Sequence, residues 1–140
     1  MDRYIVVLYF VGEGTRGRQT QAVKPTKTLL TGHSRGNPVS RIKAISISDR
    51  KGTRKTNIES TTLIADFGLE NDAHGGKWHR QVSLLAEESI ESMRAKGLEV
   101  VAGNFAENIT TEGLDLTALT VGRHIRIGAA ELVISQLGKI

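Results

Sequence analysis

Short apolar and β-branched runs, separated by glycine turns, are the feature that most constrains the fold of this chain. Five to seven such runs recur along it, and they are typical of strands. Only Ala86 to Lys96 predicts a helix, with Glu87 and Glu88 in its first turn and Gly97 as its C-cap. The pattern predicts a mainly β domain, a small closed or partly open β-barrel with one or two peripheral helices. We expect strands at 4–11, 42–48, 61–67, 81–84, 109–112, 121–127 and 131–136, with a hairpin between the last two and a short helical turn at 114–119.

Composition excludes several classes of site. The chain has 140 residues and no cysteine, so one domain is expected, without disulfides, thiolate metal ligands or a cysteine nucleophile. The longest apolar run, Ile5 to Val11, is too short to span a bilayer and is a poor signal peptide. We therefore expect a cytoplasmic protein with no membrane partner.

Charge is distributed unevenly along the chain. Residues 1–40 carry six Lys/Arg and two acids, whereas residues 41–140 carry 13 of each, so all of the net charge of +4 lies in the first 40 residues. The balanced remainder gives no reason to expect a nucleic-acid partner. We interpret 1–40 as a loose basic arm that is not native to the domain, and 41–140 as the domain itself.

A polar stretch from Gly68 to Leu85 is the first candidate site. It holds two of the four histidines and the only tryptophan, and it leads into the apolar run Val82 to Leu85. A polar loop that feeds a buried element is a common way to build a site on a rigid support. A second polar segment, Gly103 to Asn108, precedes the run expected as a strand at 109–112.

Four motifs resemble the MOSC family, named for the C-terminal domain of molybdenum cofactor sulfurases. They are IKAISISDRKGTRK, GLENDAHGGKWHRQVSLLA, GNFAENITTEGLDL and LTVGRHIRIGAAELVISQLGK, in that order, and they cover about residues 41–139. The resemblance is to the short stand-alone bacterial members. It implies a barrel-like β fold and molybdenum cofactor (molybdopterin) binding or sulfur transfer, accessory to cofactor sulfuration. It also implies a molybdoenzyme or cofactor-biosynthesis protein as partner, and no pyridoxal phosphate site in this chain.

The chain departs from the family pattern at three places. Asn71 stands where the family usually has glycine, and Asn tolerates a left-handed backbone better than most residues. Ala106 stands where the family usually has the glycine of an FGEN motif, and alanine tolerates a left-handed backbone less well. The family commonly continues past Lys139 into a segment with a conserved cysteine, whereas this chain ends at Ile140. A persulfide needs a cysteine sulfur, so we expect a truncated or degenerate member without its own sulfur carrier.

The resemblance suggests which side chains would meet the cofactor. Lys77 and Arg80 suit a phosphate, while Asn104, Glu107 and Asn108 offer donors and acceptors to the pterin edge. The alternative is that the two cations are solvated and that Glu107 and Asn108 brace their loop.

The two aromatic residues of these segments also have two interpretations. Trp78 could stack on the pterin ring, or Trp78 and Phe105 could fill the hydrophobic core, which we favour.

Three further side chains are candidates for metal binding or acid–base catalysis. Asp72, His74 and His79 are weak candidates for a metal site, and His74 and His79 are candidates for acid–base catalysis. Two alternative functions therefore stay open beside cofactor handling. One is a small reductase or hydrolase that acts on N-hydroxylated bases, and the other is a non-catalytic interaction module.

Overall fold

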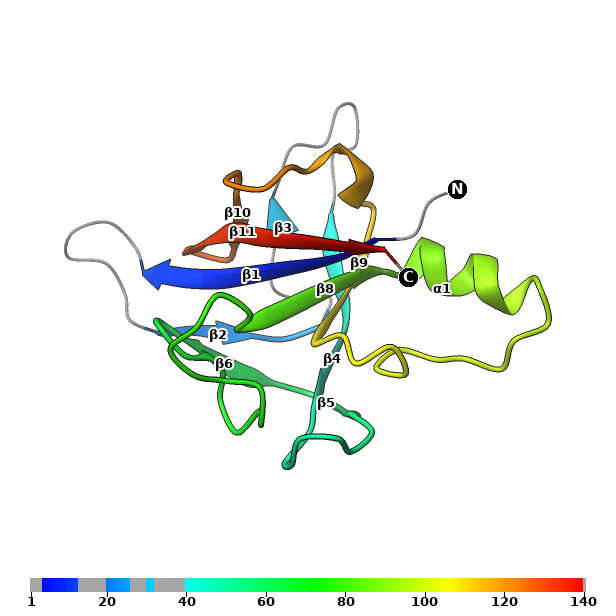
Figure 1. Ribbon diagram of the computed structural model, residues 1–140, viewed down its shortest axis with the longest axis horizontal. Coiled ribbons are helices and arrows are strands. Elements are labelled where there is room, and N and C mark those ends of the chain that lie inside the picture. The colour runs from blue at the N-terminus through cyan, green and yellow to red at the C-terminus, as the bar shows by residue number, and fades with distance from the viewer. Residues whose placement is uncertain (1–3, 13–19, 26–29, 32–39, 140) are drawn as a thin grey trace.

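The strands of this protein form one large curled sheet and one small sheet. The computed structural model describes residues 4–12, 20–25, 30–31 and 40–139. The large sheet has eight strands in the order β3-β10-β11-β1-β8-β9-β4-β5, and the small sheet has the order β2-β6-β7. Figure 1 shows the long strands curling into a half-barrel with one helix at its side. The prediction of a mainly β, barrel-like fold is confirmed.

The element bounds agree with most of the expected runs. Val121 is the main exception, because residues 121–122 form a turn and the strand begins only at His124. The elements are β1 (Tyr4–Gly12), β2 (Thr20–Val23), β3 (Leu30–Thr31), β4 (Arg41–Ile47), β5 (Thr56–Ile58), β6 (Thr61–Ile64), β7 (Gly68–Leu69), β8 (Val82–Ala86), α1 (Glu87–Arg94), β9 (Ile109–Glu112), the 3-10 turn η1 (Leu116–Ala118), β10 (His124–Ile127) and β11 (Ala130–Lys139).

Strand β1 lies in the middle of the large sheet. It pairs antiparallel with β11 along most of its length and with β8 on its other side. Its side chains Val6, Leu8 and Phe10 are fully buried, so the strand expected near the N-terminus is part of the core. The proposed boundary at residue 40 stays a prediction. Much of the expected loose arm (13–19, 26–29 and 32–39) lies outside the described residues.

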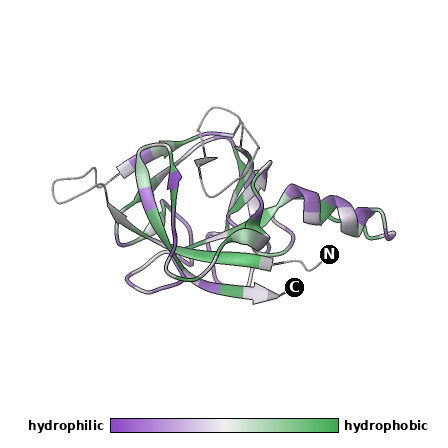
Figure 2. Cartoon of the chain, turned by 90° about the horizontal axis from the view of Figure 1, so that it is seen from above, coloured by the Kyte–Doolittle hydropathy of each residue, from purple (hydrophilic) through white to green (hydrophobic). Residues whose placement is uncertain are grey.

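The hydrophobic core is formed mainly by side chains of the large sheet. Leu84 of β8 and Ile109 of β9 are paired in register, and Ile109 in turn pairs with Ile45 of β4; all three are fully buried. Figure 2 shows the hydrophobic residues concentrated on the curled strands, while α1 carries hydrophilic and hydrophobic residues together. The helix therefore lies outside the core, as the sequence predicts.

Helix α1 ends in a Schellman motif. The Gly97 amide donates to the Arg94 carbonyl, the Leu98 amide donates to the Met93 carbonyl, and Gly97 has a φ of +96°. Glycine adopts this left-handed conformation without steric cost. Met93 and Ile90 are buried, and the helix contacts β8 and β9. The expected C-cap is thus confirmed, and Ile90 and Met93 form the apolar face by which the helix packs on the sheet.

Candidate functional site

Three loops meet at one end of the large sheet because of how their strands run. Strands β8 and β9 are parallel neighbours, so the segments that precede them, loop 70–81 and loop 103–108, enter at the same edge. Strand β4 is antiparallel to β9, so loop 48–55, which follows β4, leaves at that edge as well. The fold therefore brings the two polar segments of the sequence together and adds a third.

One buried carboxylate joins the three loops. Asp72 Oδ1 accepts from Lys55 Nζ at 2.9 Å and from the Ser48 amide at 3.1 Å, and Asp72 Oδ2 accepts from Asn108 Nδ2 at 3.0 Å. The side chains of Lys55 and Asp72 are 2% and 0% exposed. A buried ion pair is tolerated only when its remaining donors and acceptors are also satisfied, and here they are. We call Lys55, Asp72 and Asn108 the buried brace.

The side chain of Asn108 is used completely inside the protein. Its Nδ2 also donates to the Ser46 carbonyl at 3.1 Å, and its Oδ1 accepts from the Ser83 amide at 3.1 Å and from Ser83 Oγ at 3.2 Å. Asn108 is 2% exposed. Both hydrogens of Nδ2 and both acceptor sites of Oδ1 are therefore occupied. Asn108 braces its loop, which is one of the two roles considered from the sequence, and its side chain has no group left to bind a pterin edge.

Glu107 and Asn104 stabilise their own loop. Glu107 is fully buried; one of its oxygens accepts from the Phe105 amide at 3.2 Å and the other from Thr110 Oγ1 at 3.4 Å. Burial raises the pKa of Glu107, and backbone hydrogen bonds oppose this only in part. Asn104 Oδ1 accepts from the Val101 amide at 3.0 Å. Loop bracing is therefore the role the geometry supports for both residues.

Two non-glycine residues in these loops have a left-handed backbone. Asn71 has a φ of +64° and Ala106 a φ of +63°. These are the two positions where the family resemblance led us to expect glycine. The Ala106 methyl group is strained in this conformation by about 1–2 kcal/mol, whereas Asn tolerates it better. Both loops thus keep the glycine-type conformation without the glycine.

Glycine is required at Gly75 for a different reason. A Cβ at this position would lie 2.5 Å from the Phe67 ring, which is closer than real Cβ atoms approach. The backbone of loop 70–81 therefore passes directly against that ring. This contact holds the segment that carries His74 close to the sheet.

His74 is half-buried and touches the buried brace. Its Nδ1 lies 3.2 Å from Lys55 Nζ. Burial lowers the pKa of His74, the charges of Lys55, Lys51 and Arg80 lower it further, and Asp72 opposes them. His74 is therefore neutral at neutral pH.

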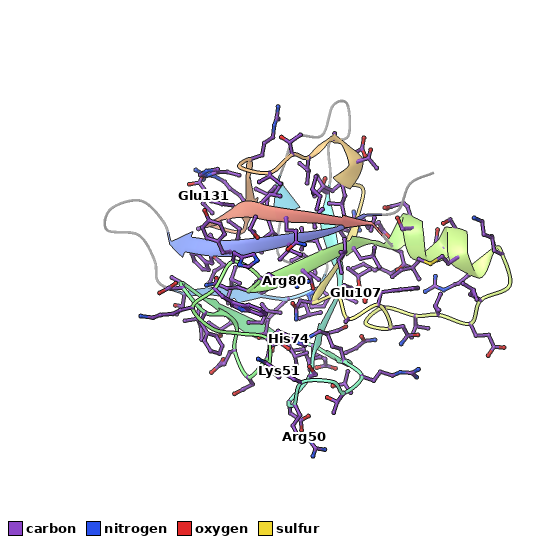
Figure 3. All side chains as sticks on the ribbon, in the orientation of Figure 1. Arg50, Lys51, His74, Arg80, Glu107 and Glu131 are labelled. Atoms are coloured by element: carbon purple, nitrogen blue, oxygen red, sulfur yellow. The ribbon has the colours of Figure 1, made fainter. Side chains whose placement is uncertain are left out.

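Two exposed cations lie around His74. Figure 3 shows His74 between Lys51 and Arg80, and the charges of both act on its imidazole. Arg50, the neighbour of Lys51 in the chain, points away from them (Figure 3). We call Lys51, His74 and Arg80 the cationic rim. It contains the hydrogen-bond donors of two basic side chains and an imidazole, which suits an anion.

Trp78 is at the surface, so its predicted place in the core is wrong. It is 40% exposed, its Nε1 donates to the His74 carbonyl at 2.9 Å, and Lys51 Nζ lies 5.8 Å from its ring. The ring supports the rim from outside. Phe105, expected in the core as well, is half-buried.

The other predicted site residues lie further out. Lys77 is 86% exposed in its side chain and is 3.8 Å from the Asp66 carboxylate, so it has a partner of its own. His79 is exposed and lies edge-on to Trp78 at 6.1 Å between ring centroids. Within the described part of the chain, no three His, Asp or Glu side chains are grouped as a metal site requires. The structure therefore adds no support to the metal hypothesis for Asp72, His74 and His79.

Lys51 and Lys55 are the site residues that sequence reasoning missed. Both lie in the motif DRKGTRK, which reads as a turn followed by a solvated basic segment. A buried lysine is rare unless it is paired, and the partner of Lys55 is 17 positions away. No local pattern distinguishes it from Arg54 beside it.

The fold and the three loops define a small β half-barrel with a polar site at one edge. Residues 71–138 match the family model of the MOSC domain. This part of the chain belongs to the MOSC domain family, which implies a molybdenum-cofactor-related function. The match includes loop 103–108 and loop 70–81 from Asn71 onward, and Lys51 and Lys55 precede it.

No match comes from the curated proteins, and none comes from the solved structures. None of the helices in the described residues is long and apolar enough to cross a membrane.

Proposed function

We propose that this domain binds the molybdenum cofactor by its phosphate end, at the cationic rim. The observation that carries the proposal is the position of His74, which touches the buried Lys55 on one side and lies between Lys51 and Arg80 on the other. Arg forms bidentate pairs with phosphate oxygens, and Lys attracts them as a point charge. The buried brace holds His74 in place, so this part of the rim is ordered before a ligand binds.

The residues present fit one part of the cofactor better than the rest. The rim offers donors to a phosphate, but the 140 residues contain no cysteine to carry sulfur or to ligate molybdenum. When bound, the cofactor would supply the dithiolene sulfurs and the metal. The chain would hold the phosphate and orient it. We therefore propose an accessory role, in which the domain holds the cofactor for a molybdoenzyme or a cofactor-biosynthesis protein.

Binding of molybdopterin under anaerobic conditions tests this proposal. The protein is incubated with molybdopterin, separated from free ligand by gel filtration, and assayed for pterin fluorescence after oxidation. We expect retention at micromolar protein and about tenfold weaker binding for Arg80→Gln, because a charge-assisted hydrogen bond is lost. Arg50→Gln is the matched control, since Arg50 is also an exposed arginine but points away from the rim. No retained pterin, or equal weakening by the control, would overturn the proposal.

The contact between His74 and Lys55 favours a second candidate function. A lysine whose Nζ lies 3.2 Å from an imidazole nitrogen can exchange a proton with it, and such a pair would suit a small reductase or hydrolase that acts on N-hydroxylated bases. Turnover of such a base that is lost in His74→Ala and kept in His124→Ala would support it. The second histidine is exposed and pairs with Glu131.

A further inference from the structure

Lys55 determines which nitrogen of His74 carries the proton. Its ammonium has three hydrogens and no acceptor, and it has three acceptors within reach. These are Asp72 Oδ1 at 2.9 Å, His74 Nδ1 at 3.2 Å and Ser48 Oγ at 3.5 Å. An ammonium can only donate, so Nδ1 has to accept.

The charge on Lys55 follows from its other partner. Asp72 accepts from the Ser48 amide and from Asn108 Nδ2 as well as from Lys55. All three groups donate to it, which matches a carboxylate that has acceptors only. A buried carboxylate with one cationic neighbour keeps that neighbour charged, because loss of either charge would leave the other unpaired.

The orientation of the ring then follows. Since Nδ1 faces the buried lysine, Nε2 is directed away from it and carries the hydrogen. The indole of Trp78 donates to the His74 carbonyl at 2.9 Å, and this fixes the backbone from which the imidazole extends. Lys55 therefore holds the ring, and Trp78 holds the backbone that carries it.

We propose that His74 is an anion-binding residue that presents a fixed Nε2–H donor to a phosphomonoester, with Lys55 as the buried residue that positions it. The proposal rests on the proposed function and names the ligand group that the rim takes. None of Lys51, Arg80 and the Nε2–H of His74 can accept a hydrogen bond. A fully deprotonated phosphate, which has acceptors only, matches such a rim better than a group that must also donate.

The tautomer can be measured without any ligand. Long-range proton–nitrogen NMR spectra of the full chain at neutral pH distinguish a protonated from an unprotonated ring nitrogen. We expect His74 to show an unprotonated Nδ1 and a protonated Nε2, with no averaging between the two. A protonated Nδ1, or fast exchange between tautomers, would overturn the inference whatever the protein binds.

Two substitutions of His74 test the donor. Glutamine can place an amide N–H near the position of Nε2, whereas asparagine is too short and reaches only the position of Nδ1. With an oxidised pterin that carries a phosphomonoester as probe, we expect His74→Gln to bind within about threefold of the original chain and His74→Asn about tenfold more weakly. His124→Gln is the control, because His124 is exposed and pairs with Glu131. Equal losses for Gln and Asn would contradict the donor role.

The comparison with a dephosphorylated probe separates the two proposals. The same pterin without its phosphate should bind the original chain and His74→Asn with similar, weaker affinity. If neither pterin binds the original chain, the proposed function fails, and the ligand assignment of His74 fails with it. If the phosphorylated pterin binds but His74 has the other tautomer, only the inference fails.

Discussion

Asn108 Nδ2 donates to Asp72 Oδ2 at 3.0 Å, and this hydrogen bond joins residues 36 positions apart. It connects the two polar loops that stand out in the sequence. Both partners are buried, so the contact belongs to the scaffold, while the exposed cations around His74 are free to meet a ligand. The site thus has a rigid interior and an accessible rim.

Loss of the Asn108 amide should destabilise the protein strongly. Asn108→Ala removes the hydrogen bonds that its side chain makes to Asp72 Oδ2, the Ser46 carbonyl and the Ser83 amide. Since unsatisfied buried groups cost about 1–3 kcal/mol each and relax in part, we expect about 2–4 kcal/mol of lost unfolding free energy in urea. Asn104→Ala is the matched control, because Asn104 caps a single backbone amide in a half-buried loop. Similar losses for both variants would contradict the bracing role.

The Lys55–Asp72 pair should behave as one unit. Lys55→Met leaves the Asp72 carboxylate buried without its cation, and breaking a buried pair in this way costs about 3–5 kcal/mol. Lys55→Met combined with Asp72→Asn should recover part of that loss, because no uncompensated charge remains. A double-mutant cycle from urea denaturation measures the coupling. Additive effects of the two changes would show that the pair does not act together.

The left-handed backbone at Ala106 predicts a stabilising substitution. Ala106→Gly removes the strained methyl group at a φ of +63°, and we expect a gain of about 1 kcal/mol in unfolding free energy, as strain relief exceeds the extra chain entropy of glycine. The control is Ala95→Gly at the end of α1, where φ is −63°. There the same change should destabilise by about 0.5–1 kcal/mol. Destabilisation at both positions would show that Ala106 is not strained.

The strands could be predicted from the sequence because their signal is local. Alternation or β-branched content marks β4 and β9, and the Gly97 cap marks the end of α1. The site could be predicted only in part, because its centre depends on contacts between distant loops. Lys55 looks like any solvated lysine until Asp72 is placed beside it, and Trp78 looks like a core residue until its indole is found bonded to the His74 carbonyl at the surface.

Contacts between distant segments also explain why the predicted pterin-binding residues are used inside the protein. Asn104, Glu107 and Asn108 were identified as a cluster of polar groups, and the structure confirms that they lie in one loop. Whether a polar group faces a ligand or the interior is decided by the neighbouring strands. For Asn108 those neighbours are Ser46 of β4 and Ser83 of β8, which together with Asp72 use all of the hydrogen-bonding capacity of its side chain.

Glu107 should give the protein a pH-dependent stability in the weakly acidic range. Burial raises the folded-state pKa of Glu107 above its ordinary value of 4.5. The folded state therefore binds the proton more tightly than the unfolded state. This contribution is fully present below the unfolded-state pKa and is lost as pH rises through the folded-state pKa.

Glu107→Gln removes this titration and keeps an oxygen that accepts from the Phe105 amide. The unfolding free energy of the original chain, relative to that of the variant, should decrease as pH is raised from about 4 through the weakly acidic range. Urea denaturation at a series of pH values measures the difference. Glu99→Gln is the control, because Glu99 is exposed. A relative stability that increases with pH would mean that hydrogen bonds to the carboxylate outweigh its burial, and that Glu107 is ionised within the loop at all but the lowest pH.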